Sequence, residues 1–388
     1  MSVRTINILG ATGSVGRSTL DVVASAPDMF DVQAVTAHSK VDELAALAVA
    51  HKAKRAVIAD EAGYAALKDA LAGTGIESAA GRTAVIEAAS MPADITMAAI
   101  VGLAGLEPVM AAIAQGKCVA IANKEPLVAA GAIVMAAART SGATLLPVDS
   151  EHNAIFQGFE ERNRAQITRL ILTASGGPFR TWSAEKMNAA TPAQAVAHPN
   201  WSMGAKISVD SATMMNKALE VIEARYLFDM PGDKIDVLVH PQSIIHSLVE
   251  YTDGSMLAQL GAPDMRTPIA YCLAWPERMP SPGMKLDLTT LSRLDFEPLD
   301  VERFPAVGLA YDCLRSGGAA CVGFNALNEV AVAAFLEGRI GFGQIVRTVQ
   351  DGLQADMVEP HSLDDVLVLD AQMRERATEI IARVKKTA

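Results

Sequence analysis

The sequence predicts an α/β protein in three parts: an N-terminal part with a parallel sheet, a loop-rich α/β middle part and a helical C-terminal part. Three observations predict this division. Strand-like and helix-like runs alternate through the first part, long loops rich in Pro, Gly, Ser and Asn follow from about Asp149, and helix-like runs follow from Ala306. Alternation of this kind is typical of a parallel sheet with helices on both faces.

Six strands are expected in the first part: Thr5–Leu9, Phe30–Thr36, Arg55–Ile58, Ile95–Ala98, Cys118–Ile121 and Thr144–Pro147. Helices lie between them, for example Ser18–Ser25 and Asp42–His51. Strands of the middle part are expected at Gln166–Thr173, Lys234–Val239, Ser247–Tyr251 and Ser255–Leu260, and Thr252-Asp253-Gly254 between the last two is a hairpin signal. C-terminal helices are expected at Ala306–Arg315, Asn325–Glu337, Phe342–Leu353 and Leu363–Lys385. The resulting segments are 1–149, 150–280, a proline-marked linker around a short strand at 281–305, and 306–388.

Composition excludes several classes of protein. Hydrophobic residues make up 51% of the 388 residues, which is enough for a large core. The net charge of −11 argues against nucleic acid or an anionic membrane as the main partner, since both need clustered Lys and Arg. We find no apolar run of about 18 residues and no signal or transit segment, so no membrane span is expected. Four isolated cysteines without a C-x-x-C pair indicate reduced thiols in the cytoplasm.

A glycine motif follows the first predicted strand. Gly10-Ala11-Thr12-Gly13-Ser14-Val15-Gly16 lies between that strand and a helix that opens near Arg17-Ser18. Glycines at this spacing let backbone N–H groups approach a pyrophosphate at a helix N-terminus. The motif therefore predicts a Rossmann-like dinucleotide site, and the alternative is an ordinary strand-to-helix turn.

The end of the second predicted strand indicates which dinucleotide would bind. An NAD site usually carries an Asp or Glu there to hold the ribose 2′-OH. This chain has His38-Ser39-Lys40 instead, with a hydroxyl and an ammonium that suit a 2′-phosphate. We therefore predict NADP(H), although Lys40 could also be a solvated loop lysine.

Carboxylates mark a candidate metal site. Asp149 and Glu151 follow a strand, and hard oxygen ligands favour Mg²⁺ or Mn²⁺. If a helix runs from Ser211, Asn216 and Glu220 share one face, so Glu220 is a candidate third carboxylate. Ser211, Asn216 and Lys217 are candidates for binding an anion such as phosphate. The alternative is an ordinary set of surface carboxylates and an exposed helix face.

Two loops complete the candidate site. Ser175-Gly176-Gly177 follows a strand and exposes a hydroxyl and backbone N–H groups, so it is either a phosphate nest or a plain turn. The run His198-Pro199-Asn200-Trp201-Ser202-Met203-Gly204 carries an imidazole, an indole and a Met between Pro and Gly. Such a loop is a candidate lid over a substrate, unless Trp201 simply packs against its own domain.

Taken together, these segments closely resemble the 1-deoxy-D-xylulose 5-phosphate reductoisomerase family, over nearly the whole chain. The motifs that carry the resemblance are GATGSVG (Gly10–Gly16), ANKE (Ala122–Glu125), LLPVDSEHNAIFQ (Leu145–Gln157), SGGPFR (Ser175–Arg180), HPNWSMG (His198–Gly204), KISVDSATMMNKALE (Lys206–Glu220), HPQSIIHS (His240–Ser247) and LAQLGAPDMRTPIA (Leu257–Ala270).

The resemblance implies conversion of 1-deoxy-D-xylulose 5-phosphate into 2-C-methyl-D-erythritol 4-phosphate, in the non-mevalonate isoprenoid pathway. It implies NADPH as reductant and Mg²⁺, Mn²⁺ or Co²⁺ as metal. Segment 1–149 would be the NADPH-binding domain, 150–280 the catalytic domain with a dimerising sheet, and 306–388 a helical domain. A skeletal rearrangement, expected to be retro-aldol cleavage and re-addition, would precede hydride transfer. The family is usually a homodimer.

The resemblance also assigns residues. It implies metal ligands at Asp149, Glu151 and Glu220, which with Lys124 and His198 are the expected catalytic residues. Substrate contacts would come from Lys124, Ser150, Glu151, Ser175, His198, Ser211, Asn216, Lys217 and Glu220. Cofactor contacts would come from Thr12, Gly13, Ser14, Val15, His38, Ser39, Lys40, Asn123, Glu125 and Gly204. Trp201 and Met203 would lie in the lid.

Two other functions fit the glycine motif. One is a different NADP-dependent dehydrogenase of a small carbonyl substrate, such as a homoserine- or semialdehyde-type enzyme. The other is a non-catalytic dinucleotide-binding module. Neither needs three carboxylates and a lid, so metal-dependent turnover distinguishes them from a reductoisomerase.

Overall fold

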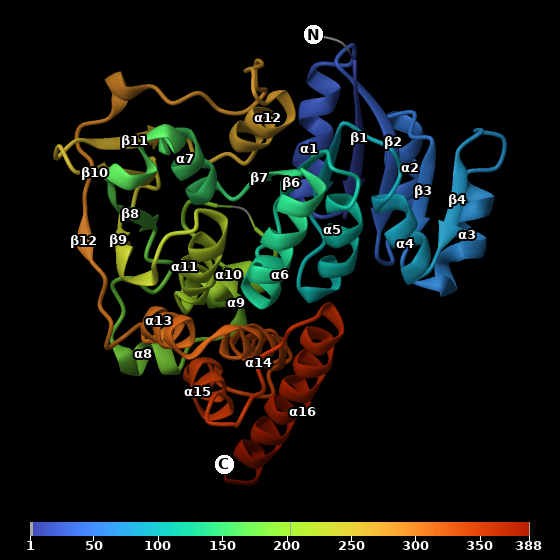
Figure 1. Cartoon of the computed structure of the whole chain (residues 1–388). Coiled ribbons are helices and arrows are strands. Elements are labelled where there is room, and N and C mark those ends of the chain that lie inside the picture. The colour runs from blue at the N-terminus through green and yellow to red at the C-terminus, as the bar shows by residue number, and fades with distance from the viewer. Residues whose placement is uncertain (1–2, 202, 388) are drawn as a thin grey trace. The chain divides into compact units, whose positions relative to one another are not determined.

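The computed structural model describes residues 3–201 and 203–387, and its contacts divide the chain into two compact units. The first comprises Met1–Pro126, Val134–Asn153 and Asp264–Met284. The second comprises Leu127–Ile133, Ala154–Pro263 and Lys285–Ala388. Figure 1 labels the elements of both. The functional segments 1–149, 150–280, 281–305 and 306–388 stay a prediction. Their boundaries follow changes in local composition along the sequence and not contacts in the structure.

A seven-stranded parallel sheet organises the first unit, in the order β4-β3-β2-β1-β5-β6-β7. Its strands are β1 (Arg4–Leu9), β2 (Phe30–Ala37), β3 (Arg55–Ile58), β4 (Glu77–Ala80), β5 (Ile95–Ala98), β6 (Cys118–Ile121) and β7 (Thr144–Pro147). All six predicted strands are confirmed, and β4 is an addition. The strand order reverses between β1 and β5, and ligands of open α/β sheets bind at such a point.

The helices of the first unit are α1 (Ser14–Ser25), α2 (Val41–Ala50), α3 (Tyr64–Ala70), α4 (Arg82–Ala89), α5 (Leu106–Ile113) and α12 (Arg266–Ala274). Two more helices, α6 (Glu125–Ser141) and α7 (Ser150–Gly158), have residues in both units. The prediction that the first helix opens near Ser18 is wrong by one turn. Gly13 is its N-cap, so Ser14 to Arg17 already form its first turn. Helix α12 packs against α1, although more than two hundred residues separate them in the sequence.

The second unit has a five-stranded sheet in the order β11-β10-β8-β9-β12. Its strands are β8 (Ile167–Ala174), β9 (Ile235–Val239), β10 (Ile245–Tyr251), β11 (Met256–Leu260) and β12 (Glu297–Pro298). Strands β8 and β9 are parallel, and the other pairs are antiparallel. The predicted hairpin is confirmed, with Gly254 in its turn at φ +84°. Strand β12 is the short strand predicted within the proline-marked linker.

Eight further helices complete this description of the second unit. They are α8 (Ala184–Asn188), α9 (Pro192–Ala195), α10 (Ala205–Ala212), α11 (Met215–Leu227), α13 (Ala306–Ser316), α14 (Gly318–Leu336), α15 (Gly343–Gly352) and α16 (Leu363–Thr387). Short 3₁₀ helices lie at η1 (Glu61–Gly63), η2 (Leu103–Gly105), η3 (Glu161–Gln166), η4 (Gly232–Lys234) and η5 (Leu288–Thr290). The four predicted C-terminal helices are confirmed, with α14 beginning seven residues before the expected Asn325.

A continuous helix from Ser211 to Glu220 does not form. Helix α10 ends at Ala212, and α11 begins at Met215 after Met214, which is buried in the left-handed region at φ +61°. The Thr213 hydroxyl donates to the Val209 carbonyl and accepts from the Met215 N–H. A threonine hydroxyl that bonds backbone groups on both sides of a break in this way favours the end of one helix and the start of the next.

The prediction that no apolar run is long enough to span a membrane is wrong for helix α14. Helix α14 has 19 residues and a mean hydropathy of 1.6, which meets the length and composition of a membrane span. It is 78% buried within the protein, and it packs against α13, α15 and α16. These contacts are those of a core helix in the second unit.

Candidate active site

The glycine loop of the first unit is built around close backbone contacts. Gly10 has φ +86°, and its N–H donates to the Thr36 hydroxyl at 3.0 Å. A Cβ on Gly16 would lie 2.2 Å from the Gly10 carbonyl oxygen, so only glycine lets α1 begin this close to the loop. Gly13 and Ser14 are exposed at the N-terminus of α1, and the first turn has no acidic residue. The loop therefore presents a helix N-terminus to an anion.

Asn123 carries a buried side-chain amide at the carboxyl edge of the same sheet. Its side chain is 6% exposed, and neither amide atom has a hydrogen-bond partner in the part of the chain that the structure describes. It packs so tightly on Gly105 that a Cβ there would lie 2.3 Å from Nδ2. Asn123 follows β6, at the sheet edge where β1 delivers Gly10. A buried amide of this kind suits the polar end of a dinucleotide.

The 38–40 turn is exposed at the end of β2. Lys40 Nζ lies 3.5 Å from Glu43 on α2, and Arg17 Nε of α1 lies 2.6 Å from the same carboxylate. The Lys40 and Arg17 side chains thus share the single carboxylate of Glu43. The positive charge that remains beside the turn suits a 2′-phosphate. The sequence analysis did not single out Arg17, because it lies in the helix and outside the glycine motif.

Lys124, Asp149 and Glu151 form a polar group in the first unit, in which Lys124 is buried and the two acids are half-buried. Lys124 Nζ lies 2.7 Å from Asp149 Oδ2, and the Ser150 hydroxyl donates to Glu151 at 2.5 Å. Burial alone would raise the pKa of Asp149, but the Lys124 ammonium holds that pKa well below its usual range. Asp149 is therefore a carboxylate at neutral pH. His152 lies 3.7 Å from it and is fully buried.

In the second unit, Ser175 and His198 meet although they come from separate segments. His198 Nδ1 accepts from the N–H groups of Asn200 and Trp201, at 3.2 and 3.0 Å. Nδ1 therefore carries no proton, and Nε2–H donates to the Ser175 hydroxyl at 2.9 Å. Burial lowers the pKa of His198 to about 4, so the imidazole is neutral at pH 7. It presents a hydrogen-bond donor, not a charge.

Helices α10 and α11 add the remaining predicted anion ligands. The Asn216 amide and the Lys217 ammonium each donate to Glu220 at 2.5 Å. Glu220 is fully buried, and Lys217 is 3% exposed. Gly177 approaches α10 so closely that a Cβ on it would lie 2.6 Å from the Ser211 carbonyl oxygen. The structure therefore brings the Ser175 loop and Ser211 together.

The predicted lid is partly anchored. Asn200 donates to the Pro241 carbonyl at 2.6 Å, and Trp201 is half-buried with its ring 6.2 Å from that of His246. Met203 is half-buried and Gly204 is exposed at the start of α10, while Ser202 lies outside the described residues. His246 was not among the predicted site residues. Burial and the nearby charge of Lys217 lower its pKa to about 4.

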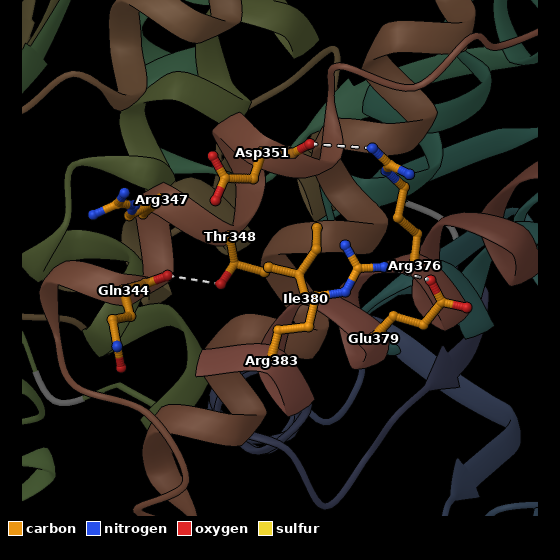
Figure 2. A pocket seen from close by; sticks show the side chains of 8 residues that line it. All are labelled: Gln344, Arg347, Thr348, Asp351, Arg376, Glu379, Ile380 and Arg383. Carbon is orange, nitrogen blue, oxygen red and sulfur yellow. Dashed lines mark hydrogen bonds and ion pairs between the residues drawn. The ribbon is translucent and has the colours of Figure 1, made fainter. Parts of the chain in front are cut away.

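A cavity of about 520 Å³ lies away from these residues, between α15 and α16 (Figure 2). Arg376 of α16 donates to the Gly352 carbonyl at 2.9 Å, which caps the end of α15. Arg383 lies 3.7 Å from Glu379 on the same helix. None of the predicted site residues lines this cavity.

Three family models match the chain. They are described as 1-deoxy-D-xylulose 5-phosphate reductoisomerase (residues 6–131), its C-terminal domain (145–228) and the DXP reductoisomerase C-terminal domain (260–376). A 1-deoxy-D-xylulose 5-phosphate reductoisomerase of Rhodospirillum centenum is 59% identical over 384 residues, covering 98% of this chain and 95% of that protein.

Solved structures agree with these matches. The enzyme from Zymomonas mobilis in complex with NADPH is 54% identical, covers 98% of this chain and 99% of its own, and has a TM-score of 0.92. A DOX-P reductoisomerase in complex with NADPH, fosmidomycin and magnesium is 43% identical, with 99% coverage of both chains and a TM-score of 0.94. The resemblance inferred from the motifs is confirmed: this chain belongs to the 1-deoxy-D-xylulose 5-phosphate reductoisomerase family.

Proposed function

We propose that this protein converts 1-deoxy-D-xylulose 5-phosphate into 2-C-methyl-D-erythritol 4-phosphate, with NADPH and a divalent cation, as a step of non-mevalonate isoprenoid synthesis. The observation that carries the proposal is the 59% identity, over 98% of the chain, to a relative named for that activity. The buried polar groups described above support it, because each serves one of the chemical needs of the reaction.

The first unit would hold the cofactor. Thr12, Gly13, Ser14 and Val15 would bind the pyrophosphate at the N-terminus of α1, and His38, Ser39 and Lys40 would meet the 2′-phosphate. Asn123, Glu125 and Gly204 are assigned to the cofactor by the family motif. For Asn123 the assignment has physical support, because its buried amide has no hydrogen-bond partner among the described residues.

The metal would be Mg²⁺ or Mn²⁺, with Co²⁺ as a further candidate, held by Asp149, Glu151 and Glu220. The donors are all carboxylate oxygens, which hard divalent cations prefer. Two of them already face a buried ammonium, Lys124 in the first unit and Lys217 in the second. When bound, the cation supplies Lewis acidity toward substrate oxygens and fixes their orientation.

The substrate phosphate would be bound by Ser175, His198, Ser211, Asn216 and Lys217. Neutral His198 can give its Nε2–H to a phosphate oxygen, and Lys217 supplies positive charge. Lys124 and Ser150 would orient the reacting end of the sugar. Trp201 and Met203 would exclude water when the lid loop closes.

The test is NADPH oxidation with 1-deoxy-D-xylulose 5-phosphate, measured with Mg²⁺ and again after EDTA. We expect turnover that EDTA abolishes and that added Mn²⁺ or Mg²⁺ restores. NADH serves as a control and should react more slowly. A folded protein that oxidises no NADPH with this sugar, but does so with homoserine or a semialdehyde substrate, would rule out the proposal.

We also propose that the enzyme is a homodimer whose sheets pair through β11. This strand lies at the edge of its sheet and exposes three apolar side chains, Met256, Leu257 and Leu260. An exposed apolar edge strand is a template for pairing with another strand, and a two-fold axis lets two copies of β11 pair with each other.

The measurement is sedimentation equilibrium of the wild type and Leu257→Glu. We expect a dimer for the wild type and a monomer for the variant. Val368→Glu on α16 is the matched control, because it also places a charge on an exposed apolar position. Equal masses for Leu257→Glu and the wild type dimer would remove β11 from the interface.

A reducing compartment suits the thiols of this protein. Cys118, Cys272, Cys313 and Cys321 are all unpaired, and three of them are buried. Burial raises the pKa of Cys272, Cys313 and Cys321, which keeps them protonated and unreactive. We propose a cytoplasmic location, which cell fractionation against a cytoplasmic marker enzyme would test.

A further inference from the structure

A buried hydrogen bond joins α10 to α14 within the second unit. Asp210 Oδ1 accepts from Asn328 Nδ2 at 2.9 Å, and Asp210 Oδ2 faces Lys206 Nζ at 2.8 Å. Asp210 is 1% exposed and Asn328 is not exposed at all. Both oxygens of an enclosed carboxylate are therefore engaged, one of them by a separate helix.

This arrangement is not what helix stability favours. In α10 a lysine lies in the first turn and an aspartate in the last, opposite to the preference of the helix dipole. In α14 the amide of Asn328 lies in an apolar core helix, and its Oδ1 has no hydrogen-bond partner among the described residues. Each helix thus contains a residue that lowers its own stability. The hydrogen bond between Asp210 and Asn328 offsets that cost and joins the two helices.

Helix α10 is well placed to transmit this constraint to the candidate site. It begins directly after the predicted lid, at its N-cap Gly204, and Ser211 follows Asp210. The Ser211 carbonyl lies against Gly177, so a shift of α10 would also displace the Ser175 loop. A tilt of α10 would thus move two predicted phosphate ligands and one end of the lid.

The partner helix α14 is itself fixed. Asn325, one turn before Asn328, donates to Glu329 at 3.0 Å. Glu329 pairs with Arg374 of α16 at 2.5 Å, and Arg374 also pairs with Asp370 at 2.6 Å. Helix α14 is therefore bound to α16 through a second set of polar contacts.

We propose that Asp210 and Asn328 are positioning residues for the substrate phosphate: their hydrogen bond locks α10 onto the C-terminal helices. This inference rests on the proposed function and assigns a task within it to the helical C-terminal part of the chain. Neither residue needs to touch the substrate.

The experiment compares Asn328→Ala with Asn325→Ala in the full-length enzyme. Both remove a fully buried amide from α14, but the Asn328 amide donates to Asp210 of α10, whereas the Asn325 amide donates to Glu329 of its own helix. For Asn328→Ala we expect KM for 1-deoxy-D-xylulose 5-phosphate to rise about tenfold, with smaller changes in kcat and in the NADPH dissociation constant. Asn325→Ala should lower the melting temperature and leave KM within about twofold of the wild type.

Asp210→Asn gives a second single variant that keeps the shape of the side chain, in case Asn328→Ala does not fold. The reciprocal exchange Asp210→Asn with Asn328→Asp restores one carboxylate and one amide, so it should recover KM to within about threefold of the wild type. Equal KM values for Asn328→Ala and Asn325→Ala, or no recovery in the exchange, would overturn the proposal. A wild type without turnover would instead refute the proposed function.

Discussion

Replacing Glu220 by Gln is expected to lower kcat/KM by on the order of a thousandfold, the scale of losing one charge-stabilising group in an active site. Gln keeps the size of the side chain, but its single amide oxygen can replace only one of the two oxygens that accept from Asn216 and Lys217. It lacks the negative charge that a divalent cation needs. It also leaves the buried Lys217 ammonium without its counter-charge, since the two side chains are 4% and 0% exposed.

NADPH binding distinguishes loss of the metal ligand from loss of the fold. The predicted cofactor residues other than Gly204 lie in the first unit, and Glu220 lies in the second. The variant should therefore bind NADPH with an unchanged dissociation constant. Glu329→Gln is the control: it neutralises another paired glutamate of the second unit, one that is half-buried, and should cost stability but not turnover. Full activity of Glu220→Gln would remove Glu220 from the proposed metal ligands.

Gly16→Ala is expected to raise the NADPH dissociation constant by on the order of a hundredfold, which corresponds to roughly 2.7 kcal/mol. The added Cβ would lie 2.2 Å from the Gly10 oxygen and 2.6 Å from the Ala11 Cα. Both are backbone atoms, so no side chain can rotate away. The first turn of α1 must move from the loop whose N–H groups would hold the pyrophosphate. We also expect about 1–3 kcal/mol of lost stability from overpacking.

Fluorescence titration with NADPH measures this effect, and Gly308→Ala is the control. Gly308 lies inside α13, and a Cβ there would meet nothing within 4 Å. Alanine at Gly308 should leave NADPH binding unchanged and stabilise the helix by about 0.5–1 kcal/mol. If Gly16→Ala binds NADPH as tightly as the wild type, the close contact between α1 and the glycine loop is not needed for the cofactor.

The sheet of the first unit could be predicted from local pattern, and the exceptions have physical reasons. Strands β3, β5, β6 and β7 have the predicted bounds, because each is a short apolar run between polar or turn residues. Strand β4 has the sequence Glu-Ser-Ala-Ala, without a β-branched residue. It becomes a strand because it can pair with the edge of β3.

Glycine explains two missed helix starts. Gly16 in the first turn of α1, and Gly318 and Gly323 in α14, have low intrinsic helix propensity. Each packs closely against a neighbour: Gly16 against the backbone of the glycine loop, Gly318 against the Glu359 carboxylate, and Gly323 against the side-chain ends of Met357 and Met373. Tertiary contacts of this kind cannot be derived from the local sequence.

The candidate site could be predicted in part. Spacing placed Asn216 and Glu220 on one helix face, and their hydrogen bond confirms it. Spacing could not show that His198 meets Ser175, because α8 and α9 lie between them in the sequence. Nor could it show the left-handed Met214, which separates Ser211 from the α11 ligands without a Gly or Pro to signal it.

Helix α14 has a consequence for how the protein is made. It is complete once Leu336 is added, yet α16, which packs along it, ends at Thr387. At about 5–20 residues per second, a ribosome finishes α16 some seconds after α14. During that interval a segment as apolar as a membrane span lacks its main cover. Helix α16 thus covers the apolar surface of α14 only at the end of synthesis. Deleting α16 would leave that surface exposed in the finished protein.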